Sequence, residues 1–296
     1  MTTKPTQRAR VIANYGGELV IMDASLSRKS AVPLKKLGLI VCGDIIDFIH
    51  ESGINRVVAL VKRTSTLSRT DRRGQAKPVA ANITQLVAVT APKPQFDPLL
   101  IDRYAVAARH IDVDLLIVIN KVDALDDITG ATAQELQDIY TGIGYRVSRC
   151  STKQHEGTSD LRRHLSNQVS ILVGQSGVGK SSILAELLPD QNIKVGALSE
   201  NSGLGKHTTT VTTWFDLPDG GAIIDSAGVR QFGLDHLNDI DLQTGFTEIN
   251  DLSATCKFND CSHTNEPECA VLTALQDKRL ARQRYEHFLY LRDNQD

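Results

Sequence analysis

Residues 174–182, with the sequence GQSGVGKSS, constrain the fold of this chain more than any other stretch. They fit G-x-x-x-x-G-K-[ST], the pattern of a loop that holds phosphate groups in nucleotide-binding α/β folds. The apolar run 169–173 predicts a buried strand before the loop, and residues 181–188 predict a helix after it. In such a loop the backbone N–H groups and the positive end of the helix face the phosphate oxygens. We expect Lys180 to reach the β and γ phosphates and the Ser181 hydroxyl to bind Mg²⁺.

A base-reading motif comes earlier in the chain. The apolar run 115–119 is typical of a central parallel strand, and it ends in N-K-x-D at residues 120–123. The carboxylate of Asp123 can accept from the ring N–H and the exocyclic amine of guanine, a donor pair that adenine lacks. Asn120 would hold the base and the loop, and the stem of Lys121 can lie along the ring. The same tetrapeptide also occurs at ordinary strand ends, so its weight comes from its pairing with the phosphate loop.

A D-x-x-G sequence at residues 225–228 follows a strand that we expect at 222–224. In this motif Asp225 would act on Mg²⁺ and the Gly228 amide on the γ-phosphate. One threonine of the run 208–210 would complete the Mg²⁺ shell when triphosphate is bound. A β-prone loop without a ligand is the alternative interpretation of that run.

The order of these motifs is unusual. Common GTPases run from the phosphate loop through the threonine switch and D-x-x-G to N-K-x-D, whereas here N-K-x-D comes first. A circular permutation can preserve such a site, because the termini of a domain often lie close together. The predicted fold class is α/β, a circularly permuted P-loop GTPase domain with further modules at both ends. The new order places D-x-x-G directly before the C-terminal segment, so movement of this switch would pass into that segment.

The N-terminal third differs from the rest in charge. Residues 1–90 hold 14 Lys and Arg against 6 Asp and Glu, whereas residues 91–296 hold 19 against 29. Short strands expected at 17–22, 44–49 and 56–61 predict a small β-barrel. The strand count does not separate an OB barrel, a type that binds nucleic acid, from an SH3-like one. We interpret residues 64–77, which include Arg69, as a mobile basic linker that could also touch phosphates. Charge alone leaves a polyanionic partner and a merely solvated basic face open.

Three cysteines and one histidine near the C-terminus have metal-ligand spacing. Cys256, Cys261, His263 and Cys269 lie within fourteen residues, which suits a tetrahedral Zn²⁺ site with no open position. Disulfides are the competing interpretation, and a cytoplasmic chain disfavours them. Residues 271–292 predict one helix, with a solvated basic face slightly favoured over RNA contact.

These features together resemble one family, the ribosome small-subunit-dependent GTPases, also called the RsgA or YjeQ family. The resemblance covers nearly the whole chain. It depends on N-K-V-D at 120–123, GQSGVGKSS at 174–182, G-K-H-T-T-T at 205–210, D-S-A-G-V-R at 225–230 and the cysteine–histidine spacing. It implies slow GTP hydrolysis that the small ribosomal subunit stimulates, assistance in late maturation of that subunit, an OB-like barrel, and a zinc-binding, mainly helical C-terminal module. Family members usually carry Pro where this chain has Ala227, which D-x-x-G tolerates.

The residue after D-x-x-G is unusual in its chemistry. Many GTPases place a Gln there to orient the attacking water, but this chain has Val229, which cannot hydrogen-bond. Either His207 in the threonine switch or the partner would position the water.

Two other classes of function stay open on the sequence: a nucleotide-gated RNA-binding module whose hydrolysis is incidental, and a small-molecule kinase, which N-K-x-D disfavours.

The expected organisation is a barrel with its linker at 1–78, a permuted GTPase domain at 79–240 and a zinc-binding domain at 241–296. No apolar run approaches the ~20 residues of a membrane helix, and residues 1–8 lack the apolar core of a secretory signal, so we expect a cytoplasmic protein. We expect it to be a monomer. Its expected partners are GTP or GDP, the small subunit and its rRNA. We expect Lys180 and His207 to act in catalysis, Zn²⁺ on the cysteine–histidine set, and Mg²⁺ with GTP on Ser181. The expected nucleotide contacts are Asn120, Lys121, Val122, Asp123, Ser151, Gly174, Gln175, Ser176, Gly177, Val178, Gly179, Lys180, Ser181, Ser182, Thr208, Thr209, Thr210, Asp225 and Gly228.

Overall fold

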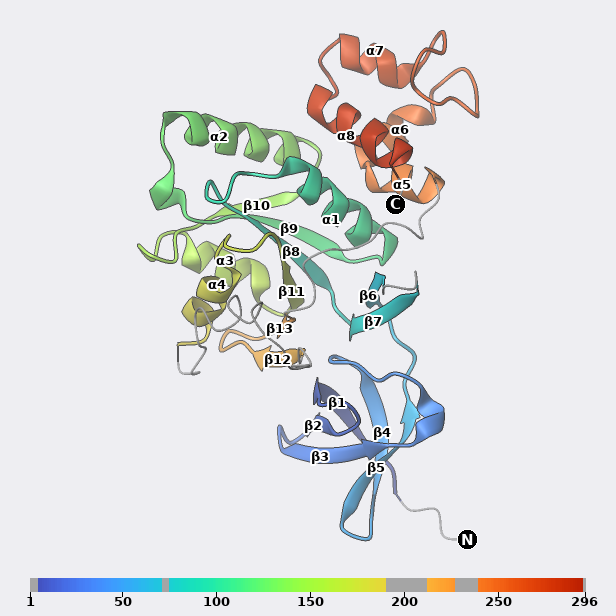
Figure 1. Cartoon of the computed structure of the whole chain (residues 1–296), viewed down its shortest axis with the longest axis vertical. Coiled ribbons are helices and arrows are strands. Elements are labelled where there is room, and N and C mark those ends of the chain that lie inside the picture. The colour runs from blue at the N-terminus through green and yellow to red at the C-terminus, as the bar shows by residue number, and fades with distance from the viewer. Residues whose placement is uncertain (1–4, 71–74, 190–211, 227–238, 295–296) are drawn as a thin grey trace, which may run out of the picture.

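The computed structural model describes residues 5–70, 75–189, 212–226 and 239–294. A β-barrel, a two-stranded hairpin, an α/β sheet and a group of C-terminal helices follow one another along the long axis of the molecule (Figure 1). In these ranges no helix is both long and apolar enough to cross a bilayer.

The barrel is closed and has five strands in the order β1-β2-β3-β5-β4, with β4 pairing back onto β1. Its core is made of aliphatic side chains from alternate strand positions, with Phe48 beside Val11, Leu19 and Ile21. The expected barrel is confirmed, although the sequence did not point to two of its strands, β1 and β3. The strands are β1 (Gln7–Asn14), β2 (Leu19–Asp23), β3 (Arg28–Pro33), β4 (Ile45–Glu51) and β5 (Ile54–Leu60), with a short 3₁₀ turn η1 (Lys35–Leu37).

The segment that we interpreted as a mobile linker is instead a hairpin. Strand β6 (Thr66–Thr70) pairs antiparallel with β7 (Ala76–Ala81). Leu67 and Ala80 are buried, so one face of the hairpin packs against the rest of the molecule. The linker prediction was wrong because the basic residues of 64–77 mask the short apolar alternation of the two strands.

The α/β part contains a sheet of six strands in the order β10-β9-β8-β11-β13-β12. All neighbouring pairs are parallel except β12 with β13, which form an antiparallel hairpin around Asp219-Gly220-Gly221. A single pair, Ala13 with Thr213, connects this sheet to the barrel through β1 and β12. The strands are β8 (Gln85–Thr90), β9 (Asp114–Ile119), β10 (Arg146–Arg149), β11 (Val169–Val173), β12 (Thr213–Asp216) and β13 (Ala222–Asp225).

Helices cover both faces of this sheet (Figure 1). One face packs Leu86 and Ile117 against α1 and α2, and the other packs Val87 and Leu116 against α3 and α4. This alternation explains the near-continuous apolar runs of the central strands, which are buried on both sides. The helices are α1 (Pro98–His110), α2 (Asp127–Gly142), α3 (Thr158–Leu165) and α4 (Lys180–Leu187), with a 3₁₀ turn η2 (Val122–Ala124).

Four helices form the C-terminal module, which packs on the outer side of α1. They are α5 (Asp239–Gly245), α6 (Thr247–Ser253), α7 (Ala270–Gln276) and α8 (Arg282–Asp293). The single helix expected at 271–292 is therefore wrong. It is broken after α7, where Lys278 takes a left-handed conformation with φ of 59° and the amide of Arg279 bonds back to Ala274.

The predicted basic face of that segment is also not fully solvated. Arg284 is buried at 1% exposure and pairs with Asp102 of α1 at 2.5 Å and with Glu248 of α6 at 2.7 Å. The Tyr140 hydroxyl from α2 and the imidazole Nδ1 of His287 also contact the Asp102 carboxylate, at 2.5 and 2.6 Å. Desolvation alone would lower the pKa of Arg284, but the two carboxylates raise it above its ordinary value. This buried ionic cluster fastens the C-terminal module to the α/β part.

Candidate functional site

The three predicted nucleotide motifs meet at one edge of the sheet. N-K-x-D follows β9, the phosphate loop follows β11, and Asp225 ends β13. These strands run parallel in one sheet, so their carboxyl ends share an edge. Ligands of open α/β sheets bind outside this edge. The permuted order along the chain therefore does not separate the motifs in space.

Glycines shape the phosphate loop where it passes close to other backbone. Gly174 has φ of 138°, and a Cβ there would lie 2.2 Å from the carbonyl oxygen of Val89. Gly179 has φ of 99°, and a Cβ there would lie 2.3 Å from Nδ2 of Asn120. Side chains are excluded at both positions by contact as well as by conformation. Of the remaining loop residues, Val178 is buried in the core beneath the loop, whereas Ser176 is exposed and Ser181 and Ser182 are half-buried.

Lys180 lies within the loop, at the first turn of α4. Its ammonium donates to the carbonyl oxygens of Gly174 and Gln175, both at 2.7 Å. Across from it, burial raises the pKa of Asp225, and the positive charge of Lys180 opposes that rise. A lysine and an aspartate in mutual electrostatic contact at a helix N-terminus are what a phosphate–metal complex requires of its site.

The N-K-x-D motif is joined directly to the phosphate loop. Asn120 is fully buried, and its side-chain amide donates to the carbonyl oxygen of Val178 at 2.9 Å. Lys121 takes a left-handed conformation with φ of 60°, and its ammonium donates to the carbonyl oxygens of Lys93 at 2.8 Å and Gly177 at 2.5 Å. The side chains of Asn120 and Lys121 therefore join the N-K-x-D loop to the phosphate loop by hydrogen bonds.

Asp123 has a partner in the segment after β10. The hydroxyl of buried Ser151 donates to Oδ1 of Asp123 at 2.6 Å and accepts from the amide of Gln154. The amide of Val122 donates to the carbonyl oxygen of Cys150, which fixes the same two segments. One oxygen of the Asp123 carboxylate is thus oriented by the protein.

One contact to the phosphate loop was not anticipated from the sequence. The side-chain amide of Gln175 donates to Oδ2 of Asp97 at 2.8 Å, while Oδ1 of Asp97 accepts from the amide of Leu100 and caps α1. An Asp followed by Pro at the first helical position is a strong helix-start signal, and it could have identified the cap. The contact to Gln175 spans 78 residues and has no local signature.

Several predicted residues lie outside the described ranges. These are the catalytic candidate His207, the three threonines Thr208, Thr209 and Thr210, and Gly228 of D-x-x-G. Their roles stay predictions.

The four predicted metal ligands lie together in the C-terminal module. The ligand atoms of Cys256, Cys261, His263 and Cys269 are all within 4.8 Å of one another. Nδ1 of His263 lies 3.6 Å from Sγ of Cys256 and 3.5 Å from Sγ of Cys269, and these two sulfurs are 3.9 Å apart. Burial lowers the pKa of His263, which favours the neutral imidazole that binds metals. This cluster could hold a metal ion.

The backbone around the metal cluster is held from outside the cluster. Tyr285 of α8 donates to the carbonyl oxygen of His263 at 2.7 Å, and Arg292 of α8 donates to that of Ser262 at 2.7 Å. The carboxylate of Glu266 accepts from the amides of Ser262 and Thr264. The helix that carries Arg284 thus also supports the ligand loop.

Comparison with known proteins identifies the family. The model of the RsgA GTPase family matches residues 60–235. The chain is 42% identical over 285 residues to the small ribosomal subunit biogenesis GTPase RsgA of Pseudomonas fluorescens, covering 95% of this chain and 83% of that protein. It is 43% identical over 292 residues to the protein of the same name from Saccharophagus degradans, with 95% and 85% covered. This chain belongs to the RsgA GTPase family. It is therefore a GTP hydrolase.

Solved structures agree with this assignment. The crystal structure of YjeQ from Thermotoga maritima superposes with a TM-score of 0.80 and 27% identity over 97% of both chains. The structure of YloQ, described as a circularly permuted GTPase, superposes with a TM-score of 0.76 and 25% identity, covering 98% of this chain and 94% of that one. The predicted fold class, a permuted GTPase domain between a barrel and a C-terminal module, is confirmed.

Proposed function

We propose that this RsgA-family protein binds the small ribosomal subunit, assists its late maturation and hydrolyses GTP faster when the subunit is bound. The observation that carries the nucleotide part is the bond from Asn120 to Val178, because it fixes a guanine-reading loop beside a phosphate loop. The subunit part depends on the similarity to relatives named for small-subunit biogenesis over 95% of the chain.

The triphosphate would occupy the loop at 174–182, with guanine on Asp123 and its ring along the stem of Lys121. Lys180 would exchange its two carbonyl partners for phosphate oxygens, a change that needs only rotation of a flexible side chain. The second oxygen of the Asp123 carboxylate remains for the guanine N–H groups while Ser151 holds the first. Ser181 and Asp225 would hold Mg²⁺, which when bound neutralises charge on the phosphates.

Positioning of the attacking water falls either to His207 or to the bound subunit, since Val229 follows D-x-x-G. Val229 offers no hydrogen-bonding group, so the isolated protein lacks at this position the side chain that orients water in many GTPases. Because this side chain is missing, the isolated protein would hydrolyse GTP slowly, and the protein bound to the subunit would hydrolyse it faster.

The metal of the C-terminal module would be Zn²⁺ with a structural role. Ligand atoms bound to a tetrahedral Zn²⁺ at the usual bond lengths lie about 3.5–3.8 Å from one another. The separations of 3.5, 3.6 and 3.9 Å among Cys256, His263 and Cys269 fit that geometry. Four protein ligands leave no position for a substrate, so this ion would stabilise the loop at 256–269.

We further propose that three parts of the chain have separate roles. Residues 1–78 would contact rRNA through their basic surface, residues 79–240 would bind and hydrolyse GTP, and residues 241–296 would contribute the zinc module. The protein would act as a monomer in the cytoplasm, where ribosomal subunits are assembled.

Sedimentation with purified subunits tests the partner. The protein with a non-hydrolysable GTP analogue should co-sediment with small subunits and not with large ones. Equal sedimentation with both, abolished by moderate salt, would reduce the proposal to non-specific attraction to RNA.

A further inference from the structure

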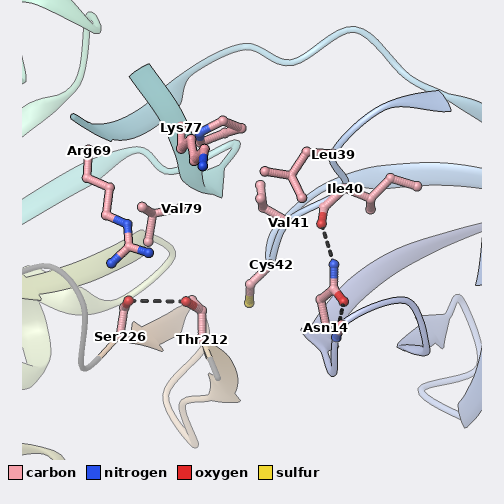
Figure 2. Close-up of a pocket in the computed structure, with 12 residues that line it drawn as sticks. Asn14, Leu39, Ile40, Val41, Cys42, Arg69, Lys77, Val79, Thr212 and Ser226 are labelled. Carbon is pink, nitrogen blue, oxygen red and sulfur yellow. Dashed lines mark hydrogen bonds between the residues drawn. The ribbon is translucent and has the colours of Figure 1, made fainter. Parts of the chain in front are cut away.

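A pocket of about 230 Å³ lies where the barrel, the hairpin and the β12–β13 strands meet (Figure 2). The loop at 39–42 of the barrel forms one wall, and Arg69 and Lys77 of the hairpin form another. Thr212, one residue before β12, and Ser226, one residue after β13, complete it. Three parts of the molecule that are distant in sequence thus contribute to one cavity.

Two hydrogen-bond donors of this pocket, on Arg69 and Ser226, have no acceptor among the described residues. Figure 2 shows the guanidinium of Arg69 reaching toward Ser226 and Thr212. The Thr212 hydroxyl donates to Oγ of Ser226 at 3.1 Å, which leaves the Ser226 O–H as a donor. Within the described ranges neither that O–H nor the Arg69 guanidinium has a hydrogen-bond acceptor. A guanidinium carries only donors, so an anionic oxygen placed beside Ser226 could accept from both Arg69 and the Ser226 O–H.

The charge of the pocket selects the kind of acceptor. Its twelve lining residues include Arg69 and Lys77 and no Asp or Glu. Outside the lining residues, the positive charge of Arg10 and the negative charge of Asp44 act in opposite directions on the pKa of the Cys42 thiol, another lining residue. A group with several negative oxygens fits this setting, and the fork of an arginine binds phosphate well. The apolar side chains of Leu39 and Val79 on the walls would contact the carbon atoms of a sugar or a base.

We propose that this pocket binds a phosphate group of an RNA strand, with Arg69 and the Ser226 hydroxyl as donors. This inference depends on the proposed function, which supplies the RNA. Ser226 directly follows Asp225, and Thr213 beside Thr212 pairs with Asp225 across β12 and β13. A phosphate in the pocket therefore contacts both segments that flank the metal-binding aspartate, and the affinity for RNA depends on the bound nucleotide. Coupling of this kind is reciprocal, so RNA also changes the affinity for nucleotide.

The test compares the full-length wild type with Arg69→Ala and Arg69→Lys. Arg163→Ala is the matched control, because Arg163 is an exposed arginine of α3 that lies outside residues 1–78 and does not line the pocket. Binding of a short labelled single-stranded RNA and of purified small subunits is measured with GDP and with a GTP analogue, over a range of salt concentrations.

We expect Arg69→Ala to weaken RNA binding about tenfold, to reduce the salt slope by about one and to reduce the difference between the two nucleotides. Arg69→Lys should fall between, and Arg163→Ala should match the wild type. Equal affinities of wild type and Arg69→Ala for RNA and subunits overturn the pocket assignment, while subunit binding by the wild type still upholds the proposed function.

If the wild type does not bind subunits, the proposed function fails, and the RNA arm alone decides the pocket. Inorganic phosphate is the second probe. Displacement of the RNA from the wild type by phosphate at similar molar concentration would assign the pocket to free phosphate and overturn the RNA proposal.

Discussion

The side-chain amide of Asn120 donates to the carbonyl oxygen of Val178 at 2.9 Å, although 58 residues separate them. Asn120 is fully buried, and Gly179 beside Val178 is packed so closely on its amide that a Cβ would not fit. The N-K-x-D loop, which we propose to read guanine, is therefore joined directly to the phosphate loop in the permuted chain. A substitution that displaces either loop should accordingly disturb both base recognition and phosphate binding.

Replacement of Asp123 by Asn should weaken GTP binding by about 1.5–3 kcal/mol, the worth of hydrogen bonds to a charged group. The new amide can donate to the 2-oxo group of xanthine, so xanthosine triphosphate should become the better ligand. Ser151 can still donate to Oδ1 of the substituted residue, which limits the change to the base. Titration of both nucleotides measures the shift; unchanged GTP affinity would remove Asp123 from the base site.

Replacement of Arg284 by Met should lower the free energy of unfolding by about 3–5 kcal/mol, because it leaves the buried Asp102 and the half-buried Glu248 without their shared arginine. Arg279→Ala is the control, since Arg279 pairs with Asp277 on the surface and such pairs contribute about 1 kcal/mol or less. Urea unfolding followed by circular dichroism compares them. Similar midpoints for the two variants would mean that the buried cluster does not fasten the C-terminal module.

Removal of one cysteine tests the metal. Cys261→Ser should release Zn²⁺ and lower the melting temperature, because binding of a structural metal contributes to folding stability. Cys42→Ala provides the comparison, since Cys42 is a buried cysteine outside the cluster. The Cys42→Ala variant should keep one Zn²⁺ per chain. Elemental analysis of the wild type that finds no zinc after purification under reducing conditions would contradict the assignment.

The single tryptophan should report the bound nucleotide. Trp214 in β12 is buried, its Nε1 donates to Asp216, and the guanidinium of Arg10 from the barrel lies 4.5 Å from its ring centroid. Triphosphate should order the segments at both ends of β12 and β13, which diphosphate does not. Trp214 emission should therefore differ between GDP and a non-hydrolysable GTP analogue, and only with Mg²⁺. Identical spectra with binding confirmed would mean that the rearrangement does not reach this strand.

The sequence predicted the parts of the fold whose signals are local. The strands at 115–119 and 169–173 are continuous apolar runs with a motif directly after each, and both are present at those positions. Strand β3 was missed because only Ala31 of its six residues is buried, so it shows little apolar alternation. The hairpin β6–β7 was missed because the basic residues of 64–77 mask its short apolar alternation.

Ionic contacts between residues far apart in the chain could not be predicted from the sequence. Arg284 stands in a basic stretch that is typical of a solvated helix face, yet its partners lie 36 and 182 residues away. Nothing local distinguishes it from its neighbour Arg282, which is exposed. The partner of Gln175 was hidden in the same way, because Asp97 is recognisable only as a helix cap.

The most direct measurement of the central claim is the rate of GTP hydrolysis as a function of added small ribosomal subunit. The protein alone should turn over slowly, since Val229 cannot orient water. Purified small subunits should raise the rate about tenfold or more, to saturation, whereas large subunits should have no effect. A rate that small subunits leave unchanged, with GTP binding confirmed, would contradict the proposal that this GTPase acts on the small subunit.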